Sequence, residues 1–90
     1  MELKGFHCIV SGNVQGVFYR ANAQKKAREL NVTGWVRNLD DGNVEVTMFG
    51  AEERLMALHN WLWKGPTAAQ VTDVTCAEIE WQSFDDFVIR

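Results

Sequence analysis

The spacing of apolar and polar positions along the 90-residue chain predicts short strands and two amphipathic helices. A partly β-branched run from Phe6 to Val10, closed by Gly12, indicates a first strand. Ala23, Ala27 and Leu30 then recur at spacings of four and three among charged residues, which is the period of an amphipathic helix. The chain is therefore expected to begin with a strand followed by a helix.

The middle of the chain predicts a hairpin and a second helix. Trp35–Leu39 and Val44–Phe49 are rich in aromatic and β-branched residues, and the Asp41-Gly42 turn between them favours a tight antiparallel connection. From Glu52 to Lys64, leucines at helical spacing mark a buried stripe, with acidic residues in the first turn and a lysine in the last. Gly65-Pro66 ends this helix.

Two more strands are expected near the C-terminal end, after a polar connection of about ten residues. Val74–Trp81 predicts the fourth strand, and Phe84, Phe87 and Val88 indicate a short last strand ending at Arg90. The order βαββαβ plus a C-terminal strand is typical of an α+β split βαβ sandwich, in which two helices cover one face of an antiparallel sheet.

This topology brings two polar segments together. A right-handed crossover makes the first and second strands parallel, with the third between them, so their C-terminal ends lie at the same edge of the sheet. The segment from Gly12 to Arg20 leaves the first strand at that edge, and Asn38 lies near the end of the second. One site can use both.

Composition narrows the classes of function. The length predicts a single domain, residues 1–90, that needs no metal or disulfide framework to fold. The net charge of −3, with basic residues scattered along the chain, disfavours binding to nucleic acids or anionic membranes. Because no 18-residue apolar run or secretion signal is recognisable, we expect a cytoplasmic location.

The cysteines and histidines do not form a recognisable motif. Cys8 and Cys76 are too few for a disulfide scaffold and are interpreted as buried apolar fillers, although a single bridge between neighbouring strands remains open. His7 and His59 lie on different predicted elements without metal-ligand spacing, so no metal site is expected.

The segment from Ser11 to Arg20 has the chemistry of an anion cradle. Gly12 and Gly16 permit backbone conformations that allow successive N–H groups to point into one concavity. Arg20 stands where the following helix should begin, so its guanidinium adds to the partial positive charge of that terminus. A phosphoryl group fits such a site.

The motifs that the sequence lacks and the polar groups that it contains together indicate the class of reaction. The loop is not GxxxxGK[ST] or GxGxxG, and neither Ser11 nor Cys8 has a base at a recognisable spacing. Backbone donors, Arg20 and Asn38 can stabilise charge and orient water but cannot shuttle protons. Acyl phosphates suit this apparatus, because a carboxylate leaves readily without a general acid.

Two ordered motifs resemble the acylphosphatase family. Gly12–Arg20 contains the Val-Gln-Gly-Val core and the aromatic-Arg pair of the family signature, and Gly34–Asn38 is similar to its Gly-Trp-Val-x-Asn segment. Gly65-Pro66 after the second helix is similar too, so the resemblance covers nearly the whole chain. Tyr19 stands where phenylalanine is common, and Leu39 where a hydroxyl residue often follows the asparagine.

The resemblance implies a ferredoxin-like fold and a small, cofactor-free monomer that hydrolyses carboxyl-phosphate anhydrides. It implies that Arg20 and Asn38 are catalytic, with Arg20 binding the phosphate and Asn38 positioning the water. Inorganic phosphate or sulfate would be product-like ligands. The implied phosphate-binding residues are Asn13, Val14, Gln15, Gly16, Val17, Phe18 and Arg20.

Two other functions are compatible with a small domain of this topology, a phosphate-binding module and an RNA-binding domain. An acylphosphatase-like binding module would recognise a phosphate or carbamoyl phosphate without turning it over, and a free-standing chain with both Arg20 and Asn38 favours the enzyme instead. RNA recognition on this topology needs exposed sheet aromatics in a defined pattern and a basic face, which the sequence lacks.

Overall fold

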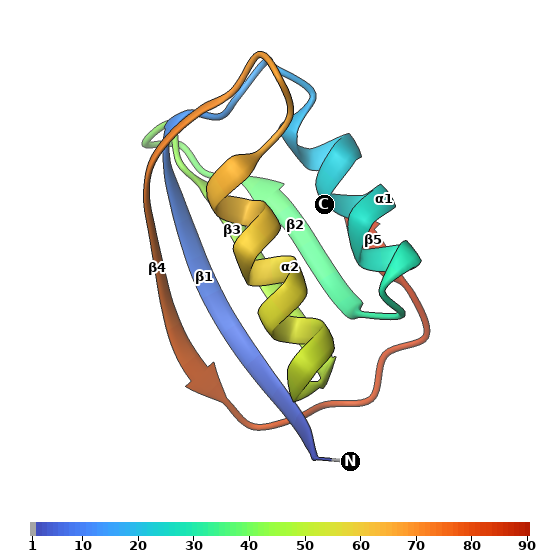
Figure 1. Cartoon of the computed structure of the whole chain (residues 1–90). Helices are drawn as coiled ribbons and strands as arrows, with labels where there is room; N and C mark the ends of the chain where they lie inside the picture. The colour runs from blue at the N-terminus through green and yellow to red at the C-terminus, as the bar shows by residue number, and fades with distance from the viewer. Residues whose placement is uncertain (1) are drawn as a thin grey trace.

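The computed structural model describes residues 2–90, in which two helices cover one face of a five-stranded sheet (Figure 1). The second helix has the predicted bounds, with Glu52 and Glu53 in its first turn and Lys64 in its last. In chain order the elements are β1 (Leu3–Asn13), α1 (Tyr19–Glu29), β2 (Thr33–Asn38), β3 (Val44–Ala51), α2 (Glu52–Lys64), β4 (Gln70–Ile79) and β5 (Phe87–Ile89).

The strand order β4-β1-β3-β2-β5 confirms the predicted split βαβ arrangement, because β1 and β2 both run antiparallel to β3, which lies between them. The sheet is nevertheless mixed, not antiparallel as predicted, because β5 pairs in parallel with β2. The chain after β4 crosses the end of the sheet where β2 begins (Figure 1), and it therefore enters β5 in the direction of β2.

The edge strand β4 begins at Gln70, four residues earlier than predicted, because its first residues pair with the end of β1. The register shifts between Ser11 and Gly12, which marks a β-bulge where β1 leads into the following loop. Gly12 has a φ of 122°, and a Cβ there would lie 2.1 Å from the carbonyl oxygen of Gln70. Only glycine fits this close approach.

The hydrophobic core lies between the helices and the sheet. Alternate residues of β1 and β3 face the helices, and the leucine stripe of α2 and two alanines of α1 pack onto them, as the periodicity predicted. The fully buried core members from these four elements are Cys8, Val10, Tyr19, Ala23, Ala27, Val44, Val46, Met48, Leu55, Leu58 and Leu62.

The opposite face of the sheet carries a charged cluster and an aromatic cluster. Arg37 Nε donates to a carboxylate oxygen of Glu45 at 2.7 Å, and His7 Nε2 lies 3.0 Å from the other oxygen. Burial alone would raise the pKa of Glu45, but the hydrogen bonds from Arg37 and His7 outweigh it and hold that pKa below its usual value. In the aromatic cluster the rings of Phe49 and Phe84 are stacked, and the Trp35 ring is tilted against both.

Cys8 and Cys76 form a disulfide that links β1 to β4. The two cysteines are directly opposite each other in the register, with their Cα atoms 4.0 Å apart. Cys8 is fully buried in the core, as expected of an apolar filler, whereas Cys76 is only partly buried against it. The single bridge that the sequence left open is present. The long-range register that brings them together is invisible in their spacing.

Candidate active site

The loop that joins β1 to α1 is fixed to the core by its two valines. Val14 is fully buried, and Val17 packs against the core cluster. Between and after them, Gly16 and Phe18 have φ values of 73° and 62°, which turn the chain back on itself. A Cβ at Gly16 would meet nothing within 4 Å, so glycine is needed there for conformation, not for space.

Gln15 fastens this loop to the connection between β2 and β3. Its Nε2 donates to the carbonyl oxygens of Leu39 and Asn43, both at 2.8 Å. Leu39 follows Asn38 directly, so the same amide group ties the loop to the end of the strand that carries Asn38. The Gln15 side chain therefore holds the loop against the end of the strand that carries Asn38, a contact that the sequence did not predict.

The start of α1 offers an uncompensated partial positive charge. The first turn of α1, all of it within the described residues 2–90, contains no acidic side chain, whereas α2 begins with Glu52 and Glu53. Tyr19 anchors this terminus, because its buried hydroxyl donates to the carbonyl oxygen of Leu62 at 2.7 Å. Burial raises the pKa of Tyr19, so its hydroxyl stays protonated and keeps donating.

Arg20 and Asn38 both line one cavity of about 290 Å³ at the edge of the sheet. The register explains why: Val10 near the end of β1 and Asn38 at the end of β2 are both partners of Val44. Arg20 takes part in none of the ion pairs formed within residues 2–90. The cavity is lined by Val14, Gly16, Phe18, Tyr19, Arg20, Ala21, Asn38 and Ile89.

The carboxamide oxygen of Asn38 is buried and accepts no hydrogen bond from any group in residues 2–90. A buried amide oxygen without a donor is costly, so such atoms in native proteins call for an explanation. A carboxamide oxygen without a donor, on a residue that lines a cavity, is suited to accept a hydrogen bond from a water molecule. Arg20 and Asn38 thus offer the cavity a cation and an acceptor.

The structure brings some of the predicted phosphate-binding residues to the cavity and leaves others outside its lining. Val14, Gly16 and Phe18 line it with Arg20, whereas Asn13 pairs with Gln70 in the sheet. Gln15 and Val17 also lie outside the lining, because their side chains point to the β2–β3 connection and to the core.

Sequence reasoning missed three residues of the cavity wall: Tyr19, Ala21 and Ile89. Tyr19 and Ala21 flank Arg20 on α1, so their position next to the predicted arginine was the available signal. Ile89 comes from β5, whose apolar sequence indicated a strand but not its neighbour. Its place at the site follows only from the parallel pairing of β5 with β2.

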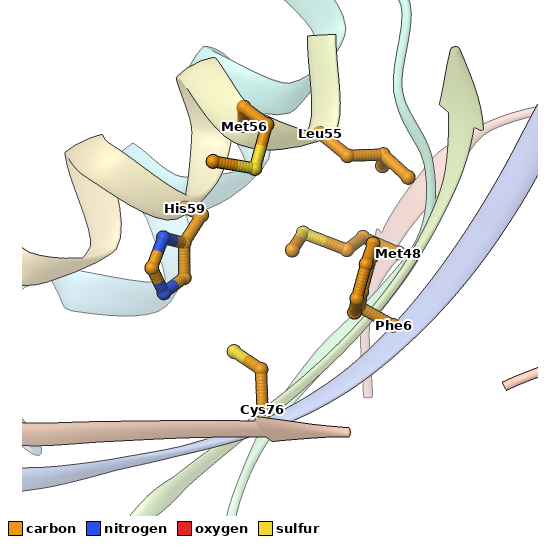
Figure 2. Close-up of a pocket in the computed structure, with 6 residues that line it drawn as sticks. All are labelled: Phe6, Met48, Leu55, Met56, His59 and Cys76. Carbon is orange, nitrogen blue, oxygen red and sulfur yellow. The ribbon is translucent and has the colours of Figure 1, made fainter. Parts of the chain in front are cut away.

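A second, smaller cavity of about 110 Å³ lies between α2 and the sheet. Figure 2 shows Met56 and His59 on the helix facing the side chains of the sheet across it. Its walls are largely apolar and include no lysine or arginine, so it is unsuited to an anion. In the part of the chain that is described, no three His, Cys, Asp or Glu side chains gather closely enough to hold a metal ion.

A ferredoxin-like α+β fold that brings a glycine loop, a helix start and Arg20 to one cavity has a geometry suited to a small anion. Residues 6–89 match the acylphosphatase family model. This chain belongs to the acylphosphatase family, which confirms the resemblance seen in the two motifs.

Known acylphosphatases match the chain over almost its full length. One from Marinobacter nauticus is 50% identical, covering 97% of this chain and 96% of that protein. One from Nitrosococcus oceani is 49% identical, covering 92% and 93%. The solved structure of an acylphosphatase from Coxiella burnetii has a TM-score of 0.94 and 45% identity, covering 98% of this chain and 93% of that one.

Proposed function

We propose that this acylphosphatase hydrolyses the carboxyl-phosphate bond of acyl phosphates, with Arg20 and the loop amides binding the phosphoryl group and Asn38 orienting the attacking water. One observation carries the assignment of these roles: Arg20 and Asn38 line the same cavity. Within residues 2–90, Arg20 forms no ion pair and the carboxamide oxygen of Asn38 accepts no hydrogen bond. The protein is then a hydrolase acting on acid anhydrides.

The reaction needs little from the protein beyond binding and orientation. The water oxygen bonds to phosphorus while the bond from phosphorus to the acyl oxygen breaks, and the carboxylate leaves with the electron pair. The acyl phosphate dianion and water give a carboxylate and dihydrogen phosphate, so both protons of the water stay on the phosphate. Because carboxylic acids have a pKa near 4, the leaving group needs no proton from the enzyme.

Arg20 and the loop act on the phosphoryl oxygens. In a loose, metaphosphate-like transition state, negative charge is spread over three equatorial oxygens. The planar guanidinium fork of Arg20 matches two of these oxygens, and the backbone N–H groups of residues 13–18 provide further donors. The partial positive charge at the start of α1, which has no carboxylate in its first turn, supports the same binding.

We further propose a cytoplasmic monomer of one domain, residues 1–90, that acts on a small-molecule acyl phosphate without a cofactor and takes phosphate or sulfate as product-like ligands. The net charge of −3 disfavours nucleic acids and anionic membranes as partners. Within residues 2–90, no helix has the length and apolarity to cross a bilayer. In a reducing cytoplasm Cys8 and Cys76 would be thiols, and the bridge would form on oxidation.

The deciding experiment measures phosphate release from benzoyl phosphate and from p-nitrophenyl phosphate, each with and without a chelator. We expect rapid phosphate release from benzoyl phosphate and little from p-nitrophenyl phosphate. An alkoxide or phenoxide leaving group lacks the stability of a carboxylate. The chelator should change nothing. Arg20→Ala, purified in the same way, controls for contaminating phosphatases.

The same experiment separates the enzyme from a binding module. A protein that binds inorganic phosphate in a titration but releases none from benzoyl phosphate would be a phosphate-recognition domain, and the proposed hydrolysis would be wrong. Release that disappears with the chelator would require a metal ion in the mechanism.

A further inference from the structure

We propose that Phe18 and Ile89 form a subsite for the acyl group, which selects aromatic or branched apolar acyl phosphates over acetyl phosphate. The inference rests on the proposed hydrolysis, because it assigns the part of the substrate that Arg20 and Asn38 do not hold. Both residues line the 290 Å³ cavity that contains Arg20 and Asn38.

Phe18 is an unusual residue for its position in exposure, in backbone conformation and in its place at the start of a helix. Phe18 is 79% exposed, its backbone is left-handed at φ 62° and ψ 23°, and it occupies the N-cap of α1, where it makes no side-chain capping hydrogen bond. A single exposed hydrophobic residue needs no explanation, but asparagine or glycine would suit this backbone and this cap far better. The aromatic ring therefore contributes something that folding does not require.

The conformation that presents the ring is held in place by the first turn of α1. The Phe18 carbonyl oxygen accepts hydrogen bonds from the backbone N–H of Asn22 at 3.1 Å and from its side-chain Nδ2 at 2.9 Å. These bonds fix the backbone while leaving the ring exposed at the cavity. A rigid aromatic surface loses little conformational entropy when a ligand packs against it.

Ile89 supplies a second apolar surface from the opposite end of the chain. It is the register partner of Val36 in the parallel pair, and it is 41% exposed. The strand is secured beyond it, because the Arg90 N–H donates to the carbonyl oxygen of Val36 at 2.9 Å and the Arg90 guanidinium lies 4.0 Å from the centre of the Trp35 ring. Ile89 is thus held on the cavity wall.

The cavity therefore has two kinds of lining. Arg20 and Asn38 are polar and suit a phosphoryl group and water, whereas Phe18, Ile89 and the small Ala21 are apolar and leave room beside them. An acyl phosphate has the same division, with a charged phosphoryl end and an acyl end that is apolar when it is aromatic or branched. Burying that acyl surface against Phe18 and Ile89 removes it from water.

The test compares kcat/KM for benzoyl phosphate with kcat/KM for acetyl phosphate in the wild type, Phe18→Asn and Ile89→Thr. Asparagine tolerates the left-handed backbone, and threonine keeps the β-branch on the strand. We expect the benzoyl-to-acetyl ratio to fall about tenfold in each variant, the size typical of losing one apolar contact in a pocket. Val88→Thr is the matched control, since Val88 is 38% exposed on the same strand but does not line the cavity.

Non-hydrolysable phosphonates test binding apart from turnover. Benzylphosphonate should inhibit the wild type more strongly than methylphosphonate, and both variants should reduce that difference. Equal losses for both substrates, or a ratio that does not change, would overturn the subsite while leaving the hydrolysis standing. A wild-type protein that hydrolyses neither substrate would overturn the proposed function and the subsite together.

Discussion

The guanidinium of Arg20 combines a permanent charge with a planar fork of donors, and no carboxylate in residues 2–90 forms an ion pair with it. Arg20→Lys keeps the charge and removes the fork. We expect kcat/KM for benzoyl phosphate to fall about 100-fold and the inhibition constant of inorganic phosphate to rise about tenfold, since bidentate contacts are the strong ones. Steady-state kinetics with phosphate as inhibitor measures both.

The matched control for this substitution is Arg28→Lys on the same helix. Arg28 pairs with Asp86 at 2.8 Å and does not line the cavity, so its kinetics should be those of the wild type. Wild-type kinetics for Arg20→Lys as well would remove Arg20 from the site.

Asn38 is expected to act on the water, not on the phosphate. Its buried carboxamide oxygen has no donor within residues 2–90, and Asn38→Ala removes this acceptor without changing the charge of the site. We expect kcat to fall about 100-fold, as for misplacement of a reacting group, with the inhibition constant of phosphate changed less than about threefold. A loss of phosphate affinity with kcat retained would make Asn38 an anion ligand instead.

Among the elements, the loop before α1 and the β2–β3 connection act as one unit because Gln15 bonds to both Leu39 and Asn43. Gln15→Ala removes these bonds and should lower kcat/KM about tenfold, with a loss of stability of about 1–2 kcal/mol. Gln15→Glu has the same length but faces two carbonyl oxygens with a carboxylate, so it should be worse on both measures. If both variants matched the wild type in kinetics and thermal unfolding, Gln15 would have no positioning role.

Glu45, on the face of the sheet opposite the helices, makes a pH-dependent contribution to the stability of the folded protein. Its pKa is lowered in the folded state, so its stabilisation is complete above about pH 4.5, the ordinary value, and is lost as the pH falls through the folded value. Glu45→Gln should therefore be less stable than the wild type at pH 7, by about 1 kcal/mol for a partly exposed pair. The difference should shrink at pH 3, as measured by urea unfolding. A constant difference would assign the loss to packing.

The sequence predicted those elements whose residue spacing and end residues are sufficient to define them. The leucine stripe and charged ends of α2 gave its bounds, and the right-handed crossover predicted that Arg20 and Asn38 would meet. The early start of β4 and the pairing of β5 depend on partners distant in the sequence. Ile89 and the Gln15 amide bonds were missed for the same reason, because their contacts cross between elements.

At the scale of the whole molecule, the Cys8–Cys76 bridge joins residues 68 positions apart and so constrains most of the chain in the unfolded state. In the chain-entropy account, closing a loop of this length stabilises the folded protein by about 4 kcal/mol. The bridge lies in the sheet, and neither cysteine lines the cavity that holds Arg20 and Asn38. Stability and catalysis should therefore respond differently to reduction.

We expect dithiothreitol to lower the free energy of unfolding in guanidinium by up to about 4 kcal/mol while kcat/KM for acetyl phosphate stays unchanged at 25 °C, where the reduced protein remains folded. Thiol titration under denaturing conditions verifies that the bridge is present before the reductant is added and absent afterwards. The double variant Cys8→Ala/Cys76→Ala is the control, because its stability should not respond to dithiothreitol. A fall in activity on reduction, in protein that circular dichroism shows to be folded, would mean that the β1–β4 link holds the loop at the end of β1 in its active conformation.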